Sequence, residues 1–147
     1  MEFKTDAHRM CFEKVHQWLK ELYGEEGVRP RTDSTMLGLN RGSAYITVLV
    51  WPNGEQDAWI TTRSWVVTKV EIVADLAKYL LRKNYDMTLG AFGIDDAGDI
   101  FFEHTILGSS CDKGELRASV GAVSYVADTY DDEIVGRWGG QRATERT

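Results

Sequence analysis

The spacing of hydrophobic and polar positions changes in the C-terminal half of the chain, from two short strands to one long helix. Residues 89–94 and 99–107 are rich in Phe, Ile and Leu. The Asp95-Asp96-Ala97-Gly98 segment between them has the small residues that tight turns favour. This pattern predicts a β-hairpin.

The helix that follows is predicted to begin after Asp112 and to end near Trp138. Asp112 and Glu115 have the spacing of a capping box, in which side chains satisfy the first free amides of a helix. Apolar residues then recur at steps of three and four: Leu116, Val120, Val123, Ala127, Tyr130 and Ile134. Most charged residues fall elsewhere: Arg117, Asp128, Asp131 and Glu133. One apolar face should therefore pack against the hairpin.

Another amphipathic helix is predicted in residues 5–23. Its apolar stripe consists of Cys11, Val15, Trp18, Leu19 and Leu22. Gly24 is placed to end this helix, because glycine adopts the left-handed conformation that helix ends often require. Residues 25–34 carry many charges and no hydrophobic period, which is typical of a loop.

The middle of the chain predicts three strands and a second helix. Residues 35–39, 44–51 and 56–67 read as strands, because turn residues separate them and β-branched and aromatic residues are frequent. Thr68 and Glu71 form a second capping box, and a wide apolar face follows until Asn84. The predicted order is α-β-β-β-α-β-β-α. Such runs of hairpin-linked strands favour an α+β fold, with an antiparallel sheet and the helices on one face.

Length and composition fit one domain over residues 1–138 with a flexible tail at 139–147. The chain has 147 residues, 43% of them hydrophobic, which is enough for one ordinary core. The formal charge of -6 and the absence of a basic run argue against a nucleic-acid partner. The first residues lack the apolar stretch of a signal peptide, and no apolar run approaches the ~20 residues that span a bilayer. We expect a cytoplasmic protein with no membrane contact.

Candidate chemistry is sparse. His8, Cys11 and His16 offer three zinc ligands on one helix, but the set lacks a fourth, so Cys11 is expected to be a buried structural cysteine. Cys111 precedes a helix, where a thiol pKa can fall, and His104 is near it in sequence, although no third group orients the pair. No cofactor or metal is expected.

Three further groups have ordinary structural explanations. Asp95, Asp96 and Asp99 resemble the start of a calcium loop, but the glutamate that would complete it is absent, so a turn is expected. Gly90-Ala91-Phe92-Gly93 lies in a strand pattern without the Lys-Ser/Thr of a phosphate-binding loop. Asp131-Asp132-Glu133 is expected to be a solvated helix face.

The second face of the predicted sheet is the most informative feature. If Ile46, Ile60 and Phe102 point towards the helices, strand alternation sends aromatic and polar residues to the opposite face. The candidate partner-binding or dimer residues there are Tyr45, Leu49, Trp51, Trp59, Trp65 and Phe101. Large exposed apolar patches generally mark partner surfaces. Two alternatives remain: a loop or the N-terminal segment covers this face, or a register slip exchanges the two faces.

The sequence resembles YbjN-like domains, which share the fold of type III secretion chaperones of the CesT (Tir chaperone) kind. The resemblance spans nearly the whole chain and rests on these segments: Gly42-Ser43-Ala44, Leu80-Leu81-Arg82-Lys83-Asn84, Gly90-Ala91-Phe92-Gly93-Ile94-Asp95, Gly98-Asp99-Ile100, Asp112 to Leu116 and Ala127-Asp128-Thr129-Tyr130-Asp131-Asp132. It implies a small α+β module, often dimeric, that binds peptides.

We therefore expect a non-enzymatic, chaperone-like module, a homodimer that binds a protein or peptide segment. Aromatic anchors would supply affinity and acidic rims selectivity. The alternative among binding proteins is a regulatory scaffold that docks a folded partner. A small enzyme using Cys111 or His104 is the third possibility, and it requires both groups and a carboxylate in one cleft.

Overall fold

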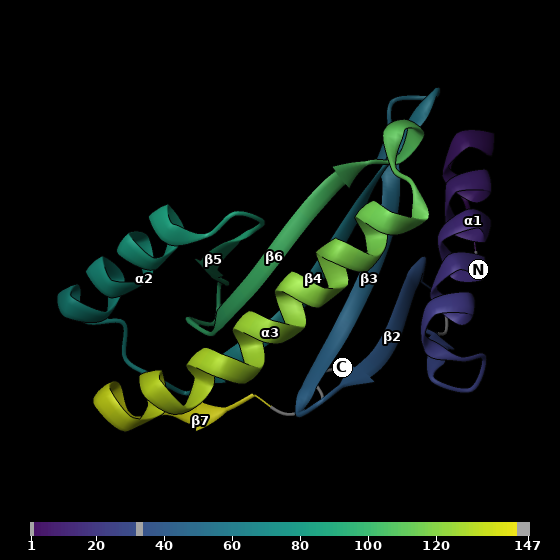
Figure 1. The fold of residues 1–147 in the computed structure, drawn as a ribbon. Helices are drawn as coiled ribbons and strands as arrows, with labels where there is room; N and C mark the ends of the chain where they lie inside the picture. The colour runs from purple at the N-terminus through teal and green to yellow at the C-terminus, as the bar shows by residue number, and fades with distance from the viewer. Residues whose placement is uncertain (1, 32–33, 144–147) are drawn as a thin grey trace.

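A computed structural model describes residues 2–31 and 34–143 (Figure 1). Its elements, in chain order, are α1 (Asp6–Tyr23), β1 (Val28–Pro30), β2 (Met36–Arg41), β3 (Ala44–Asn53), β4 (Asp57–Thr68), α2 (Ala74–Asp86), β5 (Ala91–Ile94), β6 (Ile100–Leu107), the short 3-10 turn η1 (Gly108–Ser110), α3 (Lys113–Trp138) and β7 (Gln141–Arg142).

All strands belong to one antiparallel sheet with the order β1-β2-β3-β4-β6-β5. The two-residue β7 pairs with the end of β4 at Val67 and Thr68. The predicted α+β class, with an antiparallel sheet built from hairpins, is confirmed.

The helices lie on one side of this sheet. Figure 1 shows α3 crossing the sheet, α1 beside β3 and β2, and α2 next to β5. Leu19 of α1 and Val123 of α3 are completely buried, and both belong to one core with the inward residues of the strands. The predicted stripe of α3 is confirmed, because its members line this core. Asp131, which was expected off the stripe, is also buried.

The capping residues in the sequence correctly predict where α1 begins and ends and where α3 begins. The Thr5 hydroxyl accepts a hydrogen bond from His8 N at 3.0 Å, and the Asp112 carboxylate accepts one from Glu115 N at 2.7 Å. Gly24 ends α1 with φ +92°, a conformation that a side chain would strain.

The predicted start of the second helix is wrong. Thr68 belongs to β4, where it pairs with Gln141, and α2 begins only at Ala74, after Val73, without a side-chain cap. Lys69, with φ +56°, ends the strand. Pairing of β4 with its neighbours thus outweighs a capping signal of about 1 kcal/mol.

Two short strands occur in segments that lack a hydrophobic period. Residues 25–34, expected to be a loop, contain β1, which pairs with β2 through Val28 and Leu39. In the segment expected to be a flexible tail, Gln141–Arg142 form β7, and residues 144–147 lie outside the described residues. Two or three residues are too few for an alternating pattern to show.

No helix in the described ranges has both the length and the apolar character needed to cross a lipid bilayer.

Candidate partner-binding face of the sheet

Strand alternation divides the sheet into two different faces. Ile46, Val48 and Val50 of β3 are completely buried beneath the helices. The residues between them point to the other side, which we call the outer face. It comprises Tyr45, Thr47, Leu49 and Trp51 of β3, Trp59, Thr61, Arg63 and Trp65 of β4, and Phe101, Glu103 and Thr105 of β6. All six residues proposed from the sequence lie on this face.

The strand register arranges these residues in rows. Trp51 pairs with Trp59, and Trp65 pairs with Phe101, so each end of the outer face carries an aromatic pair. The rows between them are polar except for Leu49, which pairs with Thr61. The six candidate residues are therefore not one cluster, because a polar band separates the two aromatic ends.

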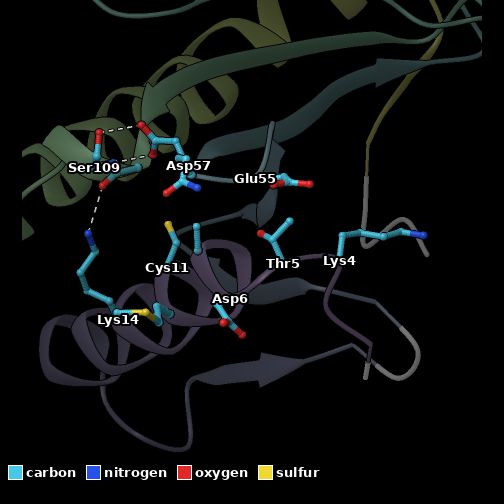
Figure 2. Close-up of a pocket in the computed structure, with 12 residues that line it drawn as sticks. Lys4, Thr5, Asp6, Cys11, Lys14, Glu55, Asp57 and Ser109 are labelled. Carbon is cyan, nitrogen blue, oxygen red and sulfur yellow. Dashed lines mark hydrogen bonds between the residues drawn. The ribbon is translucent and has the colours of Figure 1, made fainter.

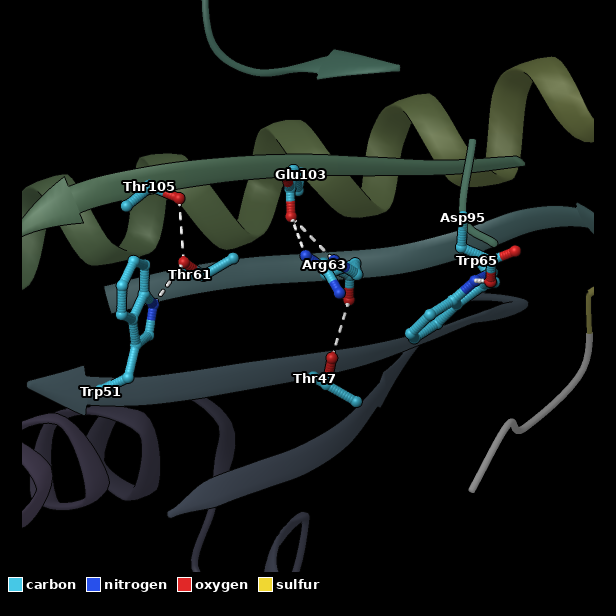
Figure 3. Close-up of polar contacts among 8 residues, drawn as sticks. All are labelled: Thr47, Trp51, Thr61, Arg63, Trp65, Asp95, Glu103 and Thr105. Atoms are coloured by element: carbon cyan, nitrogen blue, oxygen red, sulfur yellow. Dashed lines mark hydrogen bonds and ion pairs between the residues drawn. The ribbon is translucent and has the colours of Figure 1, made fainter. Parts of the chain in front are cut away.

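The first aromatic pair lies next to the β3–β4 turn. The ring centroids of Trp51 and Trp59 are 6.1 Å apart, and Trp51 is 39% exposed. Trp51 Nε1 donates a hydrogen bond to Thr61 Oγ1 at 3.0 Å, which fixes the orientation of the indole (Figure 3). The ring is thus held in place while much of its surface stays open to a partner.

The second aromatic pair lies next to the β5–β6 turn. The ring centroids of Trp65 and Phe101 are 6.3 Å apart, and Trp65 Nε1 donates to Asp95 Oδ2 at 2.9 Å. The Phe101 ring lies over Gly93, since a Cβ added at that glycine would overlap the phenyl ring. Glycine at this position is what allows the aromatic side chain to lie on the sheet.

A polar band joins the two aromatic ends. Arg63 Nε donates to Glu103 Oε2 at 2.8 Å, and the guanidinium lies 4.7 Å from the centroid of the Phe101 ring. Thr61 and Thr105 share a hydrogen bond of 2.9 Å (Figure 3). The ion pair of Arg63 and Glu103 is neutral overall, and its carboxylate and guanidinium partly satisfy each other.

Tyr45 and Leu49 extend the outer face towards β2. Tyr45 lies over Gly38, where an added Cβ would overlap the phenol, and Leu49 pairs with Met36. Gly38 and Gly93 support the face without contributing side chains, and the sequence analysis missed them. Each of them is an isolated glycine in a strand pattern, and such a glycine often marks a place where other atoms approach the backbone closely.

The described N-terminal segment does not lie over the outer face. Val15 and Leu19 of α1 are completely buried in the core on the helix side, and His8 Nε2 donates to Val50 O at 2.7 Å. Phe3 packs on His8, with ring centroids 5.4 Å apart. The helices of the described chain pack on the inner face or beside β5, so they leave the outer face available.

A separate hollow of about 850 Å³ lies between the start of α1, the β3–β4 turn and η1 (Figure 2). Its polar groups bond to one another: Asp57 accepts hydrogen bonds from Ser109 Oγ at 2.6 Å and Ser109 N at 2.9 Å. The hydrogen bond from the Ser109 hydroxyl is the main cause of a lowered Asp57 pKa. Lys14 Nζ donates to Gly108 O at 3.0 Å. These contacts tie α1 and the turn to η1.

The two thiols and His104 do not form a catalytic arrangement in the described chain. Burial raises the pKa of Cys111 to about 11 and also raises that of Cys11, so both thiols are poor nucleophiles. His104 Nδ1 is hydrogen-bonded to Ser119 Oγ at 2.8 Å, and Ser119 is completely buried. His104 and Glu115 line one hollow of about 380 Å³, and Cys111 is not among the residues that line it.

His8 is engaged through both ring nitrogens. Nδ1 accepts a hydrogen bond from Lys4 N at 3.2 Å, while Nε2 bonds to Val50 O. In the described ranges, no group of three His, Cys, Asp or Glu residues is arranged to hold a metal ion.

The described chain thus belongs to the class of α+β domains with an antiparallel sheet, helices on one face and aromatic residues on the other. Comparison with known families gives this class a name. A model described as "T3SS (YopN, CesT) and YbjN peptide-binding chaperone 1" matches residues 11–146, and the chain belongs to this family. The resemblance to YbjN-like and CesT-type chaperones seen in the sequence is thereby confirmed.

A solved structure supports the fold independently. The chain is similar to one in the "Crystal Structure of the ExsC-ExsE Complex", with a TM-score of 0.62 and 19% sequence identity. The match covers 82% of this chain and 93% of the other. At this identity the similarity shows the fold. No curated protein sequence matches the chain significantly.

Proposed function

We propose that this chain is a non-enzymatic chaperone that binds a peptide or protein segment on its outer face. The observation that carries the proposal is the pair of aromatic ends, Trp51 with Trp59 and Trp65 with Phe101, held in fixed orientations on a face that the described helices leave open. Aromatic anchors of this kind dominate the energetics of many interfaces.

Two similarities support the same proposal. The matched family is described as peptide-binding, and the similar solved structure is a complex of two proteins. The buried thiols, whose pKa values are raised, agree with a role that does not depend on their reactivity.

The experiment compares wild-type protein with the Trp59→Ser, Trp65→Ser double variant in a pull-down after chemical crosslinking. The double variant is expected to lose the partners that wild type retains, because it removes one anchor from each end of the face. Tyr125→Ser is the matched control, since Tyr125 is an exposed aromatic residue of α3, 67% exposed. Equal recovery of partners by all three proteins would show that the outer face is not the binding surface.

We also propose that the chain is a homodimer. Two surfaces could form the contact: the outer face, or an apolar ridge of α2 in which Leu81 is 69% and Tyr85 is 92% exposed. Light scattering should give twice the chain mass. A monomer from Leu81→Ser, Tyr85→Ser would place the contact on α2, and a monomer from Trp59→Ser, Trp65→Ser would place it on the outer face. A monomeric wild type at micromolar concentration would reject the dimer.

A further inference from the structure

We infer that the open half of strand β6, residues 104–107, is a second binding site. An extended segment of a partner protein adds there as a strand and places alternate aliphatic side chains in the adjoining hollow. The inference goes beyond the proposed function, because the site lies at an edge of the sheet and does not require the aromatic pairs of the outer face. Three features of the described chain carry it: an edge paired on one side, backbone groups that point outwards, and a hollow beside them.

Strand β5 covers only part of β6. Its pairing with β6 stops at Ala91 and Glu103, whereas β4 pairs with β6 as far as Leu107. Figure 1 shows β6 continuing past β5 towards η1. The chain turns away from β6 at Gly90, which has φ +86°, and a Cβ there would lie 2.7 Å from Glu103 O, so only glycine fits. Within the described chain, residues 104–107 therefore form an open edge.

The pairing pattern shows which backbone groups point to this edge. Phe92 N donates to Asn84 Oδ1 at 2.6 Å, and Asn84 Nδ2 donates to Phe92 O at 3.2 Å, so both backbone groups of Phe92 point away from β6. In an antiparallel ladder, pairs that exchange backbone hydrogen bonds alternate with pairs that do not. Phe102, the partner of Phe92, therefore bonds to β4. Thr105 and Leu107 follow it at odd spacing, so their backbone groups point to the open edge.

These backbone groups are not used inside the described chain. In the described ranges, the N–H and C=O of Thr105 and the N–H of Leu107 have no hydrogen-bond partner. The Leu107 carbonyl accepts a long hydrogen bond of 3.4 Å from the Ser110 hydroxyl. Thr105 is exposed. An added strand would therefore exchange both backbone hydrogen bonds with Thr105, which is how strand addition supplies affinity.

The two outer strands of the sheet are protected against strand addition, and the open half of β6 is not. Strand β1 has three residues and contains Pro30, which has no N–H. The centre of β5 is occupied by the Asn84 amide, which bonds to both backbone groups of Phe92. Residues 104–107 contain no proline, lysine or bulge. Because proteins usually protect an exposed edge, this open one favours a binding role.

A hollow of about 380 Å³ lies beside the open edge, between β6 and the first turns of α3. Leu89, Ile106 and Ala118 give it apolar surface. Its volume of about 380 Å³ is more than twice the roughly 150 Å³ that holds a benzene-sized group, so two side chains can enter. Alternate residues of an added strand point to the same side, about 7 Å apart, so both reach the hollow.

The lining indicates the chemistry of the partner segment. Aliphatic side chains suit Leu89, Ile106 and Ala118, while Glu115 adds an exposed carboxylate to the same hollow. The chain has a formal charge of -6. Lysine or arginine near the aliphatic residues would complement these charges and increase the rate of association. The expected segment is thus extended, with aliphatic residues at alternate positions and a basic residue beside them.

The test uses a fluorescein-labelled eight-residue peptide in which Val and Thr alternate, with Lys at both ends. A matched peptide of the same sequence is N-methylated at two adjacent central residues, so each edge of the peptide loses a donor. Fluorescence anisotropy should show at least tenfold tighter binding of the unmethylated peptide to the wild-type protein. Equal affinities, or no binding of the unmethylated peptide, would overturn the inference.

Thr105→Pro removes the donor at the centre of the edge. This N–H has no partner in the described chain, so the fold should survive. Thr105→Val keeps the N–H and loses the hydroxyl that bonds to Thr61. Thr105→Pro should bind the unmethylated peptide at least tenfold more weakly than Thr105→Val, and equal binding by the two variants would contradict strand addition.

Ala118→Trp tests the hollow and does not depend on whether the proline variant folds. The indole should fill the hollow and weaken peptide binding at least tenfold. Thr129→Trp is the matched control, because Thr129 is exposed on the same helix and does not line the hollow. Equal binding by these two variants would show that the hollow takes no side chain of the peptide.

Amide hydrogen exchange locates the bound peptide. Exchange of the Thr105 and Leu107 amides should slow at least tenfold when the unmethylated peptide is saturating, because both amides would then be hydrogen-bonded. Unchanged exchange at these two amides would place the peptide elsewhere and overturn the inference.

Two further outcomes separate the inference from the proposed function. If Trp51→Ser abolishes peptide binding and Thr105→Pro does not, the peptide lies on the outer face, so the inference fails and the proposed function stands. If light scattering shows that Thr105→Pro converts a dimer to a monomer, a second copy of the chain occupies the edge and the inference fails. Peptide bound at the edge, with no partner recovered through the outer face, would support the inference and reject the proposed function.

Discussion

At the scale of single residues, burial decides which side chains carry stability and which remain available. Val123 of α3 has no exposed surface, whereas Tyr125, two residues later, is 67% exposed. The same helix therefore offers an internal comparison of inward and outward positions.

Val123→Asp should cost several kcal/mol, because it places a carboxylate without a partner in the core. This is a large part of the ~5–15 kcal/mol by which a typical domain is stable. Urea unfolding monitored by circular dichroism measures the loss, and Tyr125→Asp should change stability little. A fully stable Val123→Asp protein would contradict the packing of α3.

His104 should make stability depend on pH. Burial lowers its pKa below the usual 6.5, so the unfolded chain takes up a proton at higher pH than the folded chain. The contribution of neutral His104 is complete above pH 6.5 and is lost as the pH falls from that value through the lower pKa of the folded state. The melting temperature of wild type should fall from pH 7.5 to 5.5 more steeply than that of His104→Gln. Equal slopes would show that His104 titrates alike in both states.

At the scale of elements, α3 runs without interruption from Lys113 to Trp138 although Gly114, Gly121 and Gly136 lie within it. Glycine lowers helix propensity by about 1 kcal/mol relative to alanine. Packing of its inward stripe on the sheet supplies the stability that the glycines do not.

Gly121→Ala should raise the free energy of unfolding by about 0.5–1 kcal/mol, because a Cβ at this position meets nothing within 4 Å. Thermal unfolding measures the gain. Gly108→Ala is the contrasting variant, since its Cβ would lie 2.9 Å from both Ala58 O and Cys11 Sγ and should destabilise the protein. A loss of stability in Gly121→Ala would mean that the outward side of α3 is covered.

At the scale of the whole molecule, the sheet separates a packed side from the outer face, which we propose binds a partner. Phe102 is completely buried, while its strand neighbour Phe101 lies on the outer face. Aromatic residues one position apart on β6 thus lie on opposite faces of the sheet, because alternate residues of a strand point in opposite directions.

Phe102→Ser should cost at least the ~3–5 kcal/mol typical of truncating a core aromatic residue. Trp59→Ser, Trp65→Ser should remain folded, since both indoles lie on the outer face and are partly exposed. Circular dichroism and thermal unfolding of the two proteins give the comparison. If the double variant unfolds as readily as Phe102→Ser, the tryptophans belong to the core and the outer face is not a free surface.

The sequence by itself determined the elements with strong periodicity. The stripe of α3, the hairpin around Asp95 and Gly98 and the alternation of β3 are local patterns, and the physics that produces them acts over a few residues. The same alternation identified the outer-face residues before their surroundings were known. Predictions that rest on one or two residues are weaker. The capping box at Thr68 does not begin a helix, because Thr68 pairs within the sheet instead.

Only the tertiary structure decided what depends on contacts between distant segments. It placed α1 on the inner side, joined Trp65 to Asp95 and Arg63 to Glu103, and brought Asn84 onto the backbone of Phe92. These partners are eight to forty residues apart in the chain. Their pairing follows from strand order and register, which no local pattern specifies, because many pairings satisfy the same alternation until the whole sheet is assembled.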